Sequence, residues 1–117
     1  GCRRFVKSKW EEIMKKLFSR FFEPKSEKQI ERDFVRAVKK RGGLPLKFVS
    51  PGRIGVPDRI VLLPGGRCTF VEIKRSGGVL RKSQIAACRE IEAQGCEVHV
   101  IRNAADIQDF CEAYFDE

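Results

Sequence analysis

The chain has 117 residues and a formal net charge of +8, with an isoelectric point near 9.5. Its length fits one domain, and its 42% of hydrophobic residues suffices for one modest core. Such a basic chain is attracted to polyanions, either nucleic acid or an anionic membrane surface, and charge alone does not choose between them. No apolar run comes near the roughly 20 residues that a membrane-spanning helix needs, so we expect no membrane insertion.

Cysteine and histidine usage argues against two further classes of small protein. No cysteines form a C-x-x-C pair, there is one histidine, and the cysteines number five: Cys2, Cys68, Cys88, Cys96 and Cys111. The odd, scattered set argues against a disulfide framework, and the missing ligand pairs argue against a zinc ribbon or zinc finger. We therefore expect a reduced, intracellular protein whose cysteines mostly fill its core.

The first 23 residues form a basic and aromatic segment that Pro24 closes. Its apolar residues recur at helical spacing: Trp10, Ile13, Met14, Leu17, Phe18, Phe21 and Phe22. Three interpretations stay open, of which packing on the domain or a partner subunit is the simplest; the others are a membrane-surface helix and a helix that grips DNA backbone. We treat residues 1–25 as an N-terminal helical extension and residues 26–117 as the main domain.

A second helix should begin at Ser26, a good N-cap, with Gln29 completing a capping box. Gly42-Gly43 should end it. Apolar patterning and glycine-containing breaks then predict strands at 44–50, 57–63 and 67–75, a helix at 81–94, a strand at 96–102 and a helix at 104–115. The order α-α-β-β-β-α-β-α predicts an α/β domain with a small mixed sheet of about four strands flanked by helices. Its β-α-β portion should be a right-handed crossover.

The third predicted strand carries the strongest chemical signal. It reads Phe70-Val71-Glu72-Ile73-Lys74. Because side chains alternate along a strand, Val71 and Ile73 should face one way and Glu72 and Lys74 the other. The strand therefore presents a carboxylate and an ammonium side by side.

Asp58 on the preceding strand should join this pair. If Pro64-Gly65-Gly66 is a three-residue loop, Leu63 faces Arg67, and counting back places Asp58 opposite Glu72. Cβ atoms of directly paired residues lie roughly 5 Å apart. Two carboxylates that close repel each other unless a proton or a cation lies between them, and a divalent ion with oxygen ligands satisfies both.

A third acid comes from the second helix. On a helical wheel, Glu27 falls within the apolar stripe of Ile30, Phe34, Val35 and Val38, which should turn its side chain towards the core; Glu31, nearer the flank, is the rival. Each acid also has an ordinary structural explanation, as an exposed strand residue, a turn residue or a first-turn acid that the helix dipole favours. Their convergence in one geometry favours a functional site.

The ordered set of motifs resembles the PD-(D/E)xK nuclease signature, in the version found in the virus-type replication-repair nuclease (VRR-NUC) family. The resemblance rests on Ser26-Glu27, Gly42-Gly43, Lys47-Phe48, Gly55-Val56-Pro57-Asp58, Phe70-Val71-Glu72-Ile73-Lys74 and Gln84. It extends from residue 26 to about residue 102 and leaves residues 1–23 outside.

This resemblance implies a restriction-endonuclease-like core and phosphodiester hydrolysis with Mg²⁺, for which Mn²⁺ can substitute. It implies that Glu27, Asp58 and Glu72 hold the metal with the backbone carbonyl of Ile73. By the same resemblance, Lys74 orients or activates the attacking water, and Gln84 steadies the lysine or the water. It further implies a homodimer that cuts branched DNA such as four-way (Holliday) junctions, in a phage or cellular repair setting.

The DNA-binding surface should be basic and read backbone rather than sequence. The candidate contacts flank the proposed site: Arg53, Arg59, Arg75, Arg81 and Lys82. Three alternatives stay open: a catalytically silent DNA-binding module of the same fold, a flap- or nick-directed repair nuclease, and a membrane-surface or partner-binding protein led by residues 1–23. His99, alone between Val98 and Val100, is interpreted as a structural strand residue.

Overall fold

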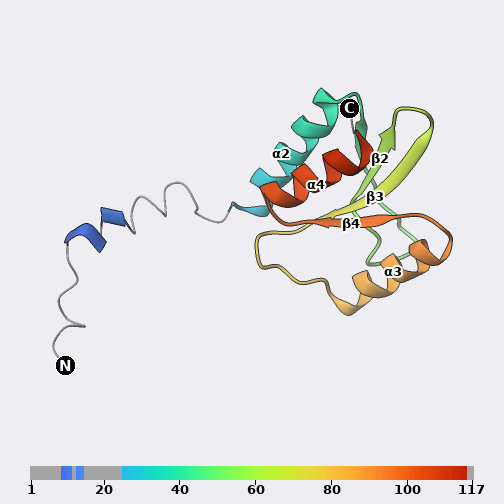
Figure 1. Cartoon of the computed structure of the whole chain (residues 1–117). Helices are drawn as coiled ribbons and strands as arrows, with labels where there is room; N and C mark the ends of the chain where they lie inside the picture. The colour runs from blue at the N-terminus through green and yellow to red at the C-terminus, as the bar shows by residue number, and fades with distance from the viewer. Residues whose placement is uncertain (1–8, 12, 15–24, 116–117) are drawn as a thin grey trace.

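The computed structural model describes residues 9–11, 13–14 and 25–115. In the predicted N-terminal extension, residues 9–11 and 13–14 are helical and Lys25 is not, and the rest of that extension lies outside the described residues. The domain then runs through α2 (Glu27–Lys40), β1 (Leu44–Lys47), β2 (Arg59–Leu63), β3 (Arg67–Ile73), α3 (Lys82–Ala93), β4 (Val98–Ile101) and α4 (Ala104–Tyr114) (Figure 1). This is the element order predicted from the second helix onwards.

The four strands form one mixed sheet in the order β1-β2-β3-β4. β2 pairs antiparallel with β1 and β3, whereas β3 and β4 run parallel and are joined through α3. All four strands are shorter than predicted: β1 ends at Lys47, β2 begins at Arg59, β3 ends at Ile73 and β4 spans 98–101. The residues beyond these strand ends belong to the loops, although the Phe48 amide still donates to the Asp58 carbonyl and the Lys74 amide to the Ile101 carbonyl, both at 2.9 Å.

Two layers of helix cover the sheet. α2 and α4 lie on one face and α3 on the other (Figure 1). The main core fills the space between the sheet and the α2–α4 layer, and it consists of Ile30, Phe34, Val38, Val61, Leu63, Val71, Ile73, Ile101, Ile107, Phe110 and Cys111. Phe34 and Phe110 join the two helices through an edge-to-face ring contact with centroids 5.1 Å apart.

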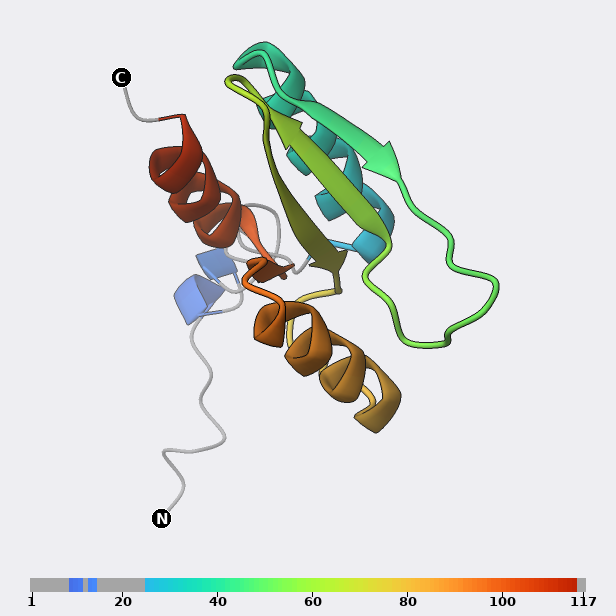
Figure 2. The ribbon, with the colours of Figure 1, turned by 90° about the vertical axis from the view of Figure 1, so that its right-hand side faces the viewer.

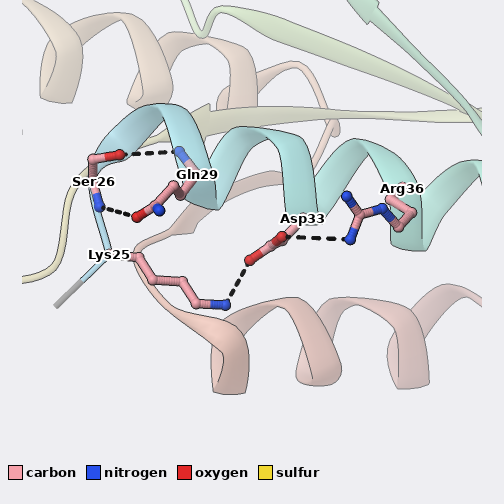
Figure 3. A network of polar contacts seen from close by, with 5 residues as sticks. All are labelled: Lys25, Ser26, Gln29, Asp33 and Arg36. Atoms are coloured by element: carbon pink, nitrogen blue, oxygen red, sulfur yellow. Dashed lines mark hydrogen bonds and ion pairs between the residues drawn. The ribbon is translucent and has the colours of Figure 1, made fainter. Parts of the chain in front are cut away.

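The start of α2 follows the predicted capping box. The Ser26 hydroxyl accepts from the Gln29 amide at 3.2 Å, and the Gln29 side chain accepts from the Ser26 amide at 3.1 Å (Figure 3). On the outer face Asp33 forms ion pairs with Lys25 and Arg36 (Figure 3). These contacts fix where the helix begins, and therefore where Glu27 lies.

A buried ion pair ties α2 to the sheet. Arg59 on β2 is 8% exposed and directs its guanidinium to the α2 side of the sheet. It donates to the Glu31 carboxylate at 2.9 and 3.2 Å and to the Pro45 carbonyl of β1 at 3.1 Å. One side chain therefore joins α2, β1 and β2.

Among the described residues no helix has both the length and the apolar character needed to cross a bilayer.

We predict that Arg59→Ala lowers the free energy of unfolding by about 2–4 kcal/mol, because it leaves Glu31 and the Pro45 carbonyl without their partner. Arg36→Ala is the matched control, since Arg36 is 78% exposed and its ion pair with Asp33 is 3.9 Å long. That variant should stay within about 0.5 kcal/mol of the wild type. Urea unfolding measures both, and equal losses would contradict the assigned role of Arg59.

Candidate active site

The β2–β3 hairpin has the register on which the predicted site depends. Leu63 pairs with Arg67 and Arg59 pairs with Val71, as the three-residue loop predicts. Asp58 directly precedes β2, and its carboxylate accepts a hydrogen bond from the Ile73 amide at 3.3 Å. Its carboxylate therefore lies against the end of β3, beside Glu72.

Glu72 is held on the face of the sheet that α3 covers. Val71 and Ile73 are in the core on the opposite face, as the alternation predicts. The Glu72 side chain is 8% exposed, and its Oε2 atom accepts from the Gln84 side-chain amide at 3.0 Å and lies 4.0 Å from the Lys74 ammonium. Burial has therefore removed most of the water that would solvate this carboxylate, and one of its oxygens accepts one hydrogen bond and has an ammonium nearby.

Gln84 contributes a contact that the sequence interpretation did not foresee. The resemblance implied that Gln84 steadies the lysine or the water, whereas the structure places its amide on Glu72. Its own oxygen accepts from the Arg81 amide at 2.8 Å at the start of α3. Because both ends of the amide are bonded, Gln84 links the first turn of α3 to the Glu72 carboxylate.

The pKa values at the site reflect two neighbouring carboxyl groups that have little access to water. The pKa of Glu72 is raised to about 7, first by burial and then by the charge of Asp58, while the Lys74 ammonium acts in the opposite direction. Burial also raises the pKa of Asp58, against the hydrogen bond from the Ile73 amide. The site therefore carries an unfavourable negative charge that a proton or a cation would relieve.

Glu27 and Glu31 occupy different environments on α2. Glu27 is exposed rather than turned into the core, because it is the first residue of the helix and the buried stripe starts one turn later at Ile30. Its charge nevertheless raises the pKa of both Asp58 and Glu72. The charge of Glu31 also raises the pKa of Asp58, but the Glu31 carboxylate already forms an ion pair with Arg59.

The structure thus brings Asp58, Glu72, Lys74 and Gln84 together, with Glu27 near them. Within residues 9–11, 13–14 and 25–115, no three His, Cys, Asp or Glu side chains are already close enough to form a metal site. Carboxylate oxygens are nevertheless the ligands that hard divalent cations prefer, and the excess negative charge at Asp58 and Glu72 matches such an ion.

The loop that leads into Asp58 rests on α3. Gly55 has a φ of +82°, and a Cβ built there would lie 2.4 Å from the Ser83 carbonyl oxygen. Arg53 of the same loop forms an ion pair with Glu90 of α3. The loop accordingly runs alongside α3 (Figure 2), which explains why the residue three before Asp58 is a glycine.

The five residues predicted to contact DNA lie in different environments. Arg81 and Lys82 are exposed at the start of α3, and Arg75 is exposed in the loop after β3. Arg53 is exposed but paired with Glu90. Arg59 is buried in the contact between α2 and the sheet, and strand alternation places its side chain on the opposite face from Glu72, so it does not lie beside Glu72.

Comparison with known proteins identifies the class. The family model described as the VRR-NUC domain matches residues 4–105, and this match starts ahead of residue 26, where the sequence motifs begin. A solved structure described as a VRR_NUC domain aligns with a TM-score of 0.71 and 25% identity, covering 78% of this chain and 100% of that one.

A curated relative extends the likeness to phage proteins. It is named "Putative nuclease p44", from Acyrthosiphon pisum secondary endosymbiont phage 1, and is 45% identical over 75 residues, which are 64% of this chain and 81% of the relative. The chain belongs to the VRR-NUC family of nuclease domains.

We predict that Glu72→Gln stabilises the metal-free protein at high pH. The folded-state pKa of about 7 exceeds the ordinary value of 4.5, so the contribution of Glu72 is fully present below pH 4.5 and is lost as the pH rises through 7. Glutamine can still accept from Gln84 but carries no charge. In EDTA the variant should match the wild type near pH 4.5 and exceed it by about 1–3 kcal/mol at pH 8.5, by urea unfolding. A difference independent of pH would contradict this account.

Gly55→Ala should lower both stability and activity, because it combines a left-handed backbone with a clash against the Ser83 carbonyl. The left-handed conformation alone costs roughly 1–2 kcal/mol for a residue with a Cβ. Gly52→Ala, in the same loop, is the control, since a Cβ there meets nothing within 4 Å. Thermal unfolding and a cleavage assay on both variants test the contact; equal behaviour of the two would argue against it.

Proposed function

We propose that this chain is a metal-dependent endonuclease that hydrolyses phosphodiester bonds in DNA, with a preference for branched DNA such as four-way junctions. The observation that carries the proposal is the convergence of Asp58, Glu72 and Lys74 at one end of the β2–β3 hairpin. Membership of a nuclease family and the name of the phage relative support it.

Asp58 and Glu72 would hold Mg²⁺, or Mn²⁺ in its place, together with Glu27 and the backbone carbonyl of Ile73. When bound, such an ion supplies Lewis-acid polarisation and acidifies a bound water. Glu27 is a better third ligand than Glu31, because it forms no ion pair with any described residue, whereas Arg59 already holds Glu31. Glu27 is exposed at the first turn of α2, near enough for its charge to act on Asp58 and Glu72.

The neighbouring residues would act on position and charge. Lys74 is 17% exposed, so its ammonium is only partly solvated and can contact a water or a phosphoryl oxygen next to Glu72. There it would orient the attacking water and stabilise negative charge in the transition state. Gln84 is a positioning residue. Its side-chain oxygen accepts from the Arg81 backbone amide, and its side-chain nitrogen donates to Glu72, which fixes the orientation of the Glu72 carboxylate.

The preference for branched DNA and the homodimer are parts of the same proposal. One small domain with one site can cut both strands of a junction only by acting in pairs or twice. The net charge of +8 suits backbone contacts, which carry no sequence information and so favour recognition by shape. Arg75, Arg81 and Lys82 lie exposed beside the site and would contribute such contacts.

The proposal predicts that the protein cuts a labelled four-way DNA junction in Mg²⁺ or Mn²⁺ but not in EDTA, and cuts a matched linear duplex far less. Lys74→Ala should lower the cleavage rate at least about 100-fold while leaving folding and DNA binding intact. Equal cutting of both substrates would keep the active site and remove the junction preference, and preferential cutting of a flap or nick would favour a repair nuclease. Binding without cleavage at any metal concentration would instead indicate a silent DNA-binding module.

A further inference from the structure

The outer face of α2 carries a row of cations that the proposed chemistry does not use. They recur on one side of the helix at positions separated by three or four residues: Lys28, Arg32, Arg36, Lys39 and Lys40. All five are exposed. This spacing is visible in the sequence, although the predicted DNA contacts lie next to the active-site motifs instead.

This row forms one wall of a groove. The groove has a volume of about 860 Å³, and the α2 cations line it together with Glu31, Val35, Lys47 at the end of β1 and Arg59. Seven of these nine residues are basic, and the one acid, Glu31, is neutralised by Arg59. The lining therefore carries a strong net positive charge, over a floor that includes Val35 and the aliphatic stems of long side chains.

Helix stability does not explain the row. Lys28, Arg32, Arg36 and Lys40 succeed one another at i, i+4 spacing, and each like-charge pair of that kind destabilises a helix by about 0.2–0.5 kcal/mol. Lys39 and Lys40 do benefit from the C-terminal end of the helix dipole, but the residues of the earlier turns do not. Within the described part of the chain, Lys28, Arg32, Lys39, Lys40 and Lys47 take part in no ion pair.

The geometry matches an extended polyanion. The 14 residues of α2 span about 21 Å, with successive cations about 6 Å apart along the axis. A DNA strand presents one phosphate per roughly 3.4 Å of duplex, so the groove is as long as about six nucleotides of one strand. The end of the groove with Lys28 and Arg59 is the end nearer to the active site, because these residues directly follow Glu27 and Asp58, although Arg59 faces the opposite side of the sheet from Glu72.

We propose that the α2 groove binds the sugar-phosphate backbone of a nucleic-acid arm that leads away from the active site. This proposal rests on the proposed function in taking DNA as the substrate, and it adds a surface distinct from the basic residues at the start of α3. Charge complementarity selects this occupant. A second copy of the same groove, or the N-terminal segment with its excess of lysine and arginine over acids, would bring like charge to like charge.

The test compares two variants that each remove two positive charges. Arg32→Gln/Lys40→Gln alters the groove, and Arg67→Gln/Arg89→Gln removes two exposed cations from the hairpin end and from α3. Loss of like-charge repulsion should leave the groove variant at least as stable as the wild type, which thermal unfolding checks. Fluorescence anisotropy in EDTA then measures affinity for a labelled DNA duplex over a series of salt concentrations.

The groove variant should reduce the slope of log affinity against log salt by about 1.8 and weaken binding roughly 10- to 30-fold near physiological salt, while the control keeps the wild-type slope. In Mg²⁺ it should raise KM and leave kcat unchanged. Equal slopes in both variants, lowered or not, would overturn the proposal. If the groove variant lost binding to phosphatidylserine vesicles but kept the DNA binding of the wild type, the proposal would be overturned in favour of a membrane-binding surface.

The two proposals fail separately. Suppose that the wild type cleaves no DNA, and that the groove variant loses salt-dependent DNA binding while its control does not. The nuclease proposal then fails and the groove proposal stands. If cleavage depends on Lys74 while the groove variant behaves like its control, the nuclease stands and the groove is an ordinary solvated face.

Discussion

The arrangement of the domain depends on one constraint: the carboxylates of Asp58 and Glu72 are held side by side with little access to water. The hairpin register brings Asp58 against the end of β3, and burial beneath α3 removes water from Glu72. Burial and the charge of Asp58 raise the pKa of Glu72 to about 7, against the nearby Lys74 ammonium. A fold selected only for stability would have little reason to keep this arrangement, whereas a site that attracts a divalent cation requires it.

The surrounding elements hold that pair in place. Gln84 connects the first turn of α3 to Glu72, and Gly55 lets the loop before Asp58 lie directly on the same turn. On the opposite face, Arg59 fixes α2 to β1 and β2, so that Glu27 begins its helix near the two acids. These three contacts therefore converge on one end of the hairpin, and a disturbance in any of them should reach the site.

Local chemistry made much of this predictable from sequence. The Ser26–Gln29 capping box determines the start of α2, and the Pro64-Gly65-Gly66 turn determines the register that ends at Arg59–Val71 and brings Asp58 beside Glu72. The tertiary contacts were not predictable. The helical wheel of Glu27 could not reveal that the buried stripe of α2 starts one turn later, at Ile30. No pattern indicated that Gln84 would contact Glu72, or that Arg59 would be buried in an ion pair with Glu31. These depend on how helices far apart in the chain pack on the sheet.

The central claim is that Asp58 and Glu72 together hold a divalent cation. Calorimetric titration of the protein with Mg²⁺ tests it directly, because the readout needs neither DNA nor catalysis. The account predicts saturable binding by the wild type and by Asp109→Asn, an exposed acid on α4, and severe loss of binding in Asp58→Asn and Glu72→Gln. Equal binding by all four proteins, each shown to be folded, would contradict it.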